Sequence, residues 1–183
     1  MEQLVQPFPR SRASPFPRFR GGIHFFAQEL ASAAGFQYTS LPMAFVSETT
    51  LRVRYAETDQ MGVAYYGNYF VWFEVGRVEF LRDLGFDYAT LEREQGCYIV
   101  VADAHCRYKA PARYDELLRI RTTLESLRGP LLKFGYAVLR DSDGTLLAEG
   151  DTTHLVADRA MKARALPETY ARVLENALEK KKA

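Results

Sequence analysis

Residues 68–84 constrain the fold of this chain more than any other segment. The segment has the length of a helix, begins at Asn68 in the position of an N-cap, and is followed by Gly85, a residue type at which helices commonly end. Apolar and aromatic residues occupy most of its circumference, namely Tyr69, Phe70, Val71, Trp72, Phe73, Val75, Val78, Phe80, Leu81 and Leu84. A helix that is apolar nearly all round must be buried on several sides. The rest of the chain therefore has to form a structure that wraps around it.

Five segments have the residue pattern of β-strands. One precedes the helix, at residues 49–56, and four follow it, at residues 98–108, 117–127, 131–140 and 146–156. Apolar and polar residues alternate within 117–127, and we therefore expect this strand to have one buried and one solvent-exposed face. The connections at 128–130 and 141–144 are short enough to make successive strands antiparallel neighbours. We predict an α+β fold in which a curved antiparallel β-sheet wraps around the long buried helix, because a doubly wound sheet would need alternating strands and helices.

The length of 183 residues fits one domain with short extensions. Residues 1–45 hold five of the eight prolines, and proline at that density opposes both helix and sheet, so we expect a disordered or extended leader there. The alternatives are an organelle transit peptide and an upstream start codon with Met43 as the working one. Residues 46–167 are the expected domain, and residues 168–183 are expected to form a C-terminal helix with a lysine tail.

Charge, hydropathy and missing motifs exclude several classes of protein. The 24 Lys and Arg against 23 Asp and Glu give a net charge of +1, which removes the main electrostatic argument for a nucleic-acid binder. No apolar run approaches the ~18 residues that a membrane-spanning helix needs, so no stable membrane insertion is expected. The sequence has no G-x-S-x-G elbow, P-loop, G-x-G-x-x-G or H-E-x-x-H motif. Serine hydrolase, nucleotide-binding and zinc-protease functions therefore lose their support.

The two cysteines, Cys97 and Cys106, are predicted to be free thiols. They lie on one expected strand, where a rise of about 3.3 Å per residue puts their α-carbons roughly 30 Å apart, far beyond disulfide reach. Free thiols without a secretory signal favour a reducing compartment, so we expect a cytoplasmic protein. Neither the cysteines nor the histidines at 24, 105 and 154 have metal-binding spacing, so we expect no metal and no other cofactor.

The stretch that carries chemistry is residues 58–69, where Asp59 lies in a glycine-containing loop just before the helix. Backbone N–H groups at a helix N-terminus are unpaired and carry a positive partial charge, so they can polarise a carbonyl and hold an oxyanion. A carboxylate on the same loop can act as a general base on water or attack directly as a nucleophile. Such a pair suffices for a thioester, because the leaving thiolate is a weak base with a thiol pKa of about 8.5.

Three motifs occur in the order found in a known family. They are Asp59-x-x-Gly62-Val63-x-Tyr65-x-x-Asn68-Tyr69 with Glu74 and Arg77 on the helix, then Tyr108-Lys109-Ala110-Pro111-Ala112-Arg113, then Ser126-Leu127-Arg128-Gly129. From about residue 49 to residue 167 the chain resembles the 4-hydroxybenzoyl-CoA thioesterase group of hot-dog-fold proteins, which includes the bacterial acyl-CoA thioesterases associated with the Tol-Pal cluster. The leader at 1–45 departs from the family pattern.

The resemblance implies a hot-dog fold and an acyl-CoA thioesterase that acts as a homodimer or homotetramer with its sites at the subunit interface. Asp59 matches the catalytic carboxylate, and the backbone N–H of Tyr66 matches the group that faces the thioester oxygen. The expected substrate-binding residues are Tyr65, Gly67, Asn68, Lys109, Arg113 and Arg128. Tyr65 or Tyr66 would contact the acyl group, and the three cations would meet the phosphates of coenzyme A.

Several alternatives stay open at this point. Asp59 would also suit an Asx-type turn, and Glu74 is a rival carboxylate, although in mid-helix it is expected to pair with Arg77 three residues on. His154 is expected to be structural. The alternative functions are a non-catalytic acyl-CoA-binding module and an acyl-ACP thioesterase, and the sequence does not fix the acyl group.

Overall fold

The computed structural model describes residues 45–86 and 88–179 of the chain. Its elements are, in chain order, β1 (Val46–Arg52), the 3₁₀ turn η1 (Tyr55–Glu57), α2 (Asn68–Asp83), α3 (Tyr88–Gln95), β2 (Tyr98–Tyr108), β3 (Leu117–Arg128), β4 (Leu131–Arg140), β5 (Leu146–Ala157) and α4 (Glu168–Glu179). The expected leader lies outside the described residues except for Phe45, and so does the lysine tail at 180–183.

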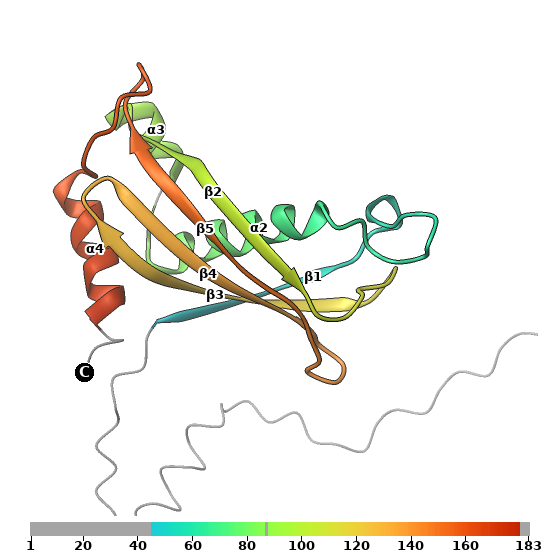
Figure 1. Cartoon of the computed structure of the whole chain (residues 1–183). Coiled ribbons are helices and arrows are strands. Elements are labelled where there is room, and N and C mark those ends of the chain that lie inside the picture. Colours follow the sequence, from blue (N-terminus) through green and yellow to red (C-terminus); the bar gives the residue numbers. More distant parts are fainter. Residues whose placement is uncertain (1–44, 87, 180–183) are drawn as a thin grey trace, which may run out of the picture. The chain divides into compact units, whose positions relative to one another are not determined.

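The strands form one antiparallel sheet of five strands in the order β1-β3-β4-β5-β2. Figure 1 shows α2 running across one face of this curved sheet, with α4 beside the end of β3. Trp72, Phe73 and Phe80 of α2 are fully buried, in a core that includes Ile120 of β3 and Phe134 of β4. The predicted α+β architecture, a curved antiparallel sheet around one long helix, is confirmed.

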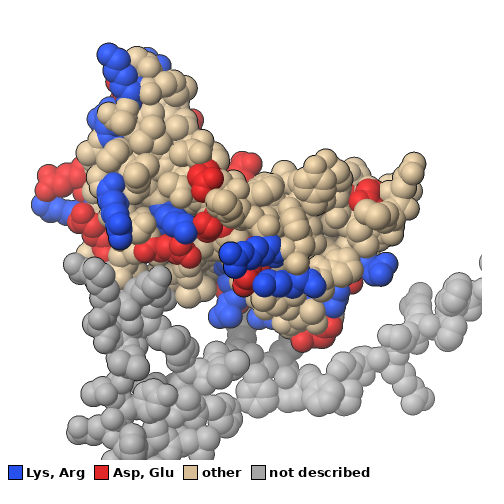
Figure 2. Space-filling model, viewed as in Figure 1, with Lys and Arg blue, Asp and Glu red and all other residues tan. Residues whose placement is uncertain are grey.

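The two faces of the sheet differ in the way that the alternation in β3 predicts. Leu118, Ile120 and Leu124 point inward and are buried, whereas Arg119 and Arg121 point outward. On the outer face Glu48 of β1 pairs with both arginines, at 3.7 Å from Arg119 and 2.7 Å from Arg121. Basic and acidic side chains lie interspersed on the face seen in Figure 2, as expected for a solvated surface with a net charge near zero.

Most element boundaries agree with the sequence prediction, but the start of the domain does not. β1 begins at Val46 and ends at Arg52, instead of spanning 49–56. Tyr55, expected to share a buried side with Leu51 and Val53, lies in η1 and its exposed fraction is 79%. Beyond the last β1–β3 pair, the Val53 N–H bonds Glu116 O at 3.0 Å and Val53 O accepts the Asp115 N–H at 3.0 Å, so this residue pairs with the loop before β3 and not with the strand.

The expected cap of α2 is also corrected. Gly67, not Asn68, occupies the N-cap position, and it makes no side-chain capping bond. Asn68 is the first helical residue, and its side-chain amide donates to Glu57 O at 2.7 Å. Gly85 does follow the helix, with φ +75°, a conformation that favours glycine.

Among the residues that the structure describes, part of α2 stays uncovered, so the expectation of burial on several sides holds only in part. Val71 is 44% exposed and Glu74 is exposed, on the side of the helix turned away from the sheet. The edge strand β2 is similar, because Val101 is 59% exposed and most of the strand after it is exposed too. An apolar helix side and a long sheet edge are thus both accessible. Within the described ranges, no helix is long and apolar enough to cross a membrane.

Candidate active site

The loop between η1 and α2 is a tight hairpin that carries Asp59 near its tip. Thr58 pairs with Ala64 in an isolated antiparallel bridge, Asp59 N–H bonds Val63 O at 2.9 Å, and Gly62 N–H bonds Asp59 O at 3.0 Å. Gly62 has φ +73°, which only glycine adopts without strain, so this residue permits the turn. The hairpin therefore returns the chain to the start of α2 within a few residues of Asp59.

Asp59 uses one of its carboxylate oxygens in this turn and leaves the other available. Its Oδ1 accepts the Met61 N–H at 2.8 Å, which is an Asx-type turn, so the structural role considered for this residue is real. Among the described residues no donor contacts Oδ2, and the side chain is only half-buried. Turn formation and chemistry are compatible at this residue, because they require different oxygens.

The start of α2 presents unpaired backbone N–H groups on the same loop. Tyr65 O accepts the Asn68 N–H at 3.0 Å, so Tyr66 and Gly67 are the central residues of a turn. In the described part of the chain, the N–H groups of Tyr66 and Gly67 donate to no protein acceptor. The rings of Tyr65 and Tyr66 lie beside them, exposed, with centroids 4.4 Å apart. The arrangement offers positive dipoles to an anionic oxygen next to an aromatic surface.

Glu57 holds this loop to the helix, and it was not among the residues predicted for the site. The residue is 5% exposed, and its carboxylate accepts bonds from the Arg54 backbone N–H, the Arg54 guanidinium and the Trp72 indole N–H. Burial alone would raise the pKa of Glu57, but the hydrogen bonds from Arg54 and Trp72 outweigh it and lower that pKa. The only local signal was an acid three residues after Arg54, a spacing typical of capping.

Tyr108, at the end of β2, contacts the start of α2 from the side of the sheet. Its hydroxyl donates to Tyr66 O at 3.1 Å, and its ring packs edge-on against Tyr69 at 5.0 Å. Burial, together with the neighbouring Cys106, raises the pKa of Tyr108 to about 12, so the hydroxyl keeps its proton. In the sequence Tyr108 was recognised only as part of a motif, because its contact with Tyr66 joins residues 42 positions apart.

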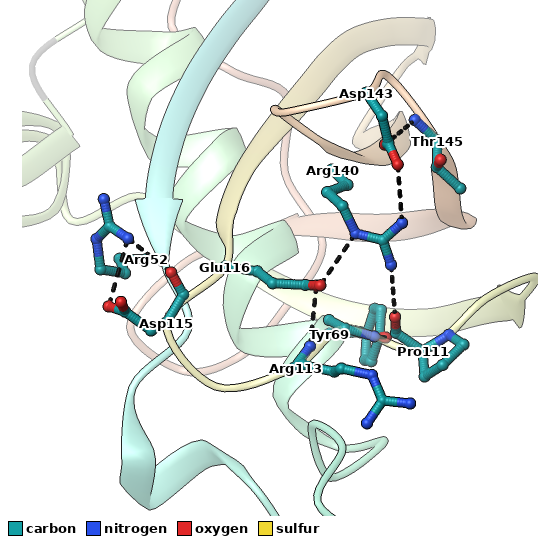
Figure 3. A network of polar contacts seen from close by, with 10 residues as sticks. Arg52, Tyr69, Pro111, Arg113, Asp115, Glu116, Arg140, Asp143 and Thr145 are labelled. Atoms are coloured by element: carbon teal, nitrogen blue, oxygen red, sulfur yellow. Dashed lines mark hydrogen bonds and ion pairs between the residues drawn. The ribbon is translucent and has the colours of Figure 1, made fainter.

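Segment 111–116 forms the wall beside the loop and is fixed by a polar network (Figure 3). Arg140 contacts Glu116 at 3.1 Å and Pro111 O at 3.2 Å, and Glu116 accepts the Arg113 N–H at 3.0 Å. Ala112 O in turn accepts the Ala64 N–H at 2.8 Å. The network therefore couples the end of β4 to the hairpin that carries the acid.

The three predicted phosphate-binding cations do not lie together. Arg113 is exposed beside Ala112, at the hairpin, and Lys109 directly follows Tyr108, although its ammonium is 2.9 Å from Glu149. Arg128 is at the opposite end of β3, opposite Leu131 in the β3–β4 hairpin. One chain thus brings two of the three cations to the loop end of the sheet.

The remaining candidates lie away from the loop. Glu74 is exposed, and no ion pair between it and Arg77 forms among the described side chains, so the expected i,i+3 pair is wrong. Arg77 instead contacts His154 Nε2 at 3.2 Å, and His154 is fully buried on β5. Within the described ranges no group of three or more His, Cys, Asp or Glu is placed to hold a metal ion.

Comparisons with known proteins identify the class of protein to which this fold and this loop belong. The family model described as "Thioesterase-like superfamily" matches residues 53–176. The chain therefore belongs to the thioesterase-like superfamily, and it is an enzyme of the thioester hydrolase class with a hot-dog fold.

Relatives and solved structures agree with this assignment. The acyl-CoA thioester hydrolase YbgC of Escherichia coli is 37% identical over 120 residues, which are 65% of this chain and 88% of that protein. The crystal structure of hypothetical protein TT1821 from Thermus thermophilus has a TM-score of 0.67 and 40% identity, covering 72% of this chain and 98% of that one. The DHNA-CoA thioesterase from Staphylococcus aureus has a TM-score of 0.67 and 34% identity, covering 74% and 89%. A 4-hydroxybenzoyl-CoA thioesterase mutant, with a TM-score of 0.65 and 18% identity over 70% of this chain and 98% of that one, shares the fold.

Proposed function

We propose that this protein hydrolyses an acyl-CoA thioester to a carboxylic acid and free coenzyme A, with Asp59 as the catalytic carboxylate. The observation that carries the proposal is the hairpin, which combines an acid whose Oδ2 is available with the unpaired N–H groups of Tyr66 and Gly67. The acyl-CoA thioester hydrolase named among the relatives supports the choice of coenzyme A as the carrier.

In this mechanism the thioester oxygen accepts hydrogen bonds from the N–H groups of Tyr66 and Gly67, which stabilise the negative charge that develops on it. Asp59 either removes a proton from a water that attacks the carbonyl carbon or attacks that carbon itself. In both routes the C–S bond then breaks, and the thiolate of coenzyme A leaves without an acid catalyst, since a simple thiol has a pKa of about 8.5. The first route gives the carboxylic acid directly, and the second gives a mixed anhydride, which water hydrolyses. No cofactor takes part in these steps.

The substrate would lie along the surface beside the hairpin. The exposed rings of Tyr65 and Tyr66 suit the acyl group, and Arg113 and Lys109 suit the phosphates of coenzyme A. Asn68 would act indirectly, because its side-chain amide already donates to Glu57 O. Arg128 has no place in the site of a single chain, because it lies at the far end of β3.

We also propose that the site is completed by a second copy of the chain in a homodimer or homotetramer. The β2 edge has no partner strand in the five-stranded sheet. Val101 is exposed on β2, Val71 is exposed on α2, and Tyr65 and Tyr66 are exposed just before α2. Pairing of two such edges would bury these groups and remove an edge that favours aggregation. A cytoplasmic location stays a proposal as well, resting on the two free cysteines.

The test is an acyl-CoA panel with detection of the free thiol, run on the full chain and on Asp59→Asn. Asparagine keeps the Oδ1 acceptor of the turn but can neither take a proton nor attack, so kcat should fall by about 10² to 10⁴. Asp158→Asn is a matched control, because Asp158 closes a similar turn through Oδ1 to the N–H groups of Ala160 and Lys162.

Three outcomes would overturn parts of the proposal. Wild-type kcat in folded Asp59→Asn would remove Asp59 from the mechanism. Binding of acyl-CoA without any release of thiol by the wild type would favour the non-catalytic binding module. Turnover of acyl-ACP but not of acyl-CoA would change the carrier and leave the rest of the mechanism intact.

A further inference from the structure

Glu57 is a carboxylate inside the protein, two residues before Asp59, and every oxygen of it is engaged. Its Oε2 accepts the Arg54 backbone N–H at 2.7 Å. Its Oε1 accepts both the Arg54 guanidinium at 2.9 Å and the Trp72 indole N–H at 3.2 Å. Removing a carboxylate from water is unfavourable unless such donors replace the water. The site therefore contains a buried anion whose position is fixed by three hydrogen bonds.

The backbone of the same residue reaches the start of the helix. Glu57 O accepts the Tyr65 N–H at 2.8 Å and the Asn68 side-chain amide at 2.7 Å. The side chain contacts Trp72, about one turn further along α2. Glu57 thus contacts the chain before the hairpin, the chain after it and the first two turns of the helix, and both ends of the Asp59 hairpin are fixed through one residue.

We propose that Glu57 is a positioning residue for thioester hydrolysis, which sets the distance between the Asp59 carboxylate and the N–H groups of Tyr66 and Gly67. This inference rests on the proposed function of Asp59. The tip of the hairpin, Asp59 to Gly62, is half-buried or exposed, so its position depends on the bonds at its base. We call the hydrogen bonds of Glu57 to Arg54, Trp72, Tyr65 and Asn68 the Glu57 clamp. A misplacement of about 1 Å between reacting groups can lower the rate by a factor of about 10², so this clamp is sufficient to control turnover.

Glu57→Gln tests the clamp with little change in shape. The amide has one acceptor oxygen where the carboxylate has two, so its NH₂ group must face either the Arg54 backbone N–H or the donors at Oε1. At least one of the three side-chain bonds is lost, which weakens the attachment of the hairpin base to Arg54 or to Trp72, while the backbone bonds of Glu57 O to Tyr65 and Asn68 remain. Trp72 is the only tryptophan of the chain and is 1% exposed, so intrinsic fluorescence reports this contact directly.

The experiment measures kcat, KM, tryptophan emission and thermal unfolding for the full-length wild type, Glu57→Gln, Asp59→Asn and the double variant. We expect Glu57→Gln to unfold cooperatively, to shift the emission of Trp72, and to lower kcat about 10- to 100-fold while KM changes less than about threefold. In the Asp59→Asn background the same substitution should cost less than about threefold, because Glu57 acts through Asp59. Glu48→Gln, which alters an arginine-paired carboxylate on the outer face, should leave kcat and emission unchanged.

Two results would overturn the inference. One is wild-type kcat in a folded Glu57→Gln protein, and the other is an equal loss in the wild-type and Asp59→Asn backgrounds. Neither is confused with failure of the proposed function, which is reported by the activity of Asp59→Asn alone. If Glu57→Gln does not fold, Arg54→Met replaces it, because the Arg54 side chain is 72% exposed and the core does not depend on it. That variant should lower kcat at least about threefold, again only when Asp59 is present, and wild-type kcat would refute the clamp.

Discussion

His154 links the stability of this fold to pH through a bond geometry that leaves it neutral. The side chain is fully buried on β5, and its Nε2 lies 2.8 Å from Thr152 Oγ1 and 3.2 Å from the Arg77 guanidinium. Arginine can only donate, so Nε2 is assigned as the acceptor and the proton is assigned to Nδ1. Burial, together with the charge of Arg77, lowers the pKa of His154 to about 4.

The size and sign of the effect follow from that pKa. A histidine has a pKa of about 6.5 in the unfolded chain. Between pH 6.5 and about 4, His154 is therefore protonated in the unfolded state and neutral in the folded state. The free energy of unfolding therefore falls as the pH falls through this window. At about 1.4 kcal/mol per pH unit, the loss on reaching pH 4 is about 3 kcal/mol, a large part of the stability of an ordinary domain.

The assay is urea unfolding followed by tryptophan fluorescence, at several values between about pH 4 and pH 7.5. His154→Gln retains an acceptor for Arg77 but does not titrate, so its free energy of unfolding should lose about 3 kcal/mol less than that of the wild type over this range. Other groups whose pKa differs between the folded and the unfolded state affect both proteins equally. His105→Gln on the exposed side of β2 is the control and should parallel the wild type. If wild type and His154→Gln show parallel curves, the lowered pKa of His154 is wrong.

Three further outcomes are expected. Gly76→Ala should lower the free energy of unfolding by about 1–3 kcal/mol in urea, because the new Cβ would lie 2.5 Å from Thr122 Oγ1 and push α2 off the sheet; unchanged stability would show that the helix can shift freely. Tyr108→Phe should lower kcat roughly tenfold with little change in KM, since the peptide after Tyr66 loses the bond that orients the Gly67 N–H, and an unaltered kcat would remove that role. Specific activity should fall on dilution in step with sedimentation to monomer, whereas a fully active monomer would contradict the shared site.

The sequence predicted the strands well where hairpins and alternation coincide. The bounds of β2 and β4 agree with the expected 98–108 and 131–140, and β3 and β5 extend only one residue beyond expectation. β1 was misplaced because Leu51, Val53 and Tyr55 continue an alternating pattern after the chain has left the sheet. Periodicity records which residues are apolar, and it does not record where hydrogen bonding to the neighbouring strand stops.

The candidate site divides in the same way. Asp59 and the helix start are adjacent in sequence, so a local motif was enough to single them out. Glu57 and Tyr108 act through contacts with residues 15 and 42 positions away, and no local pattern carries that information. The distance of Arg128 from the hairpin, by contrast, follows from the length of β3, because Arg113 precedes the first residue of that strand and Arg128 is its last, and the predicted strand at 117–127 already implied it.

The presence of Gly67 at the N-cap, where Asn68 had been predicted, explains how the first N–H groups of α2 remain available for a ligand. A capping side chain at residue 67 would accept one of the first N–H groups of α2 and compete with any anion that binds there. Gly67 has no side chain to do so, and Asn68, a good capping residue type, directs its amide toward Glu57 O instead. With glycine at the N-cap the helix gives up only roughly a few tenths of a kcal/mol relative to a capping side chain, and the bonds between Glu57, Asn68 and Trp72 hold the helix start in place. The same residues that leave the N–H groups open thus keep them in position, which is what a site that stabilises a transient oxyanion requires.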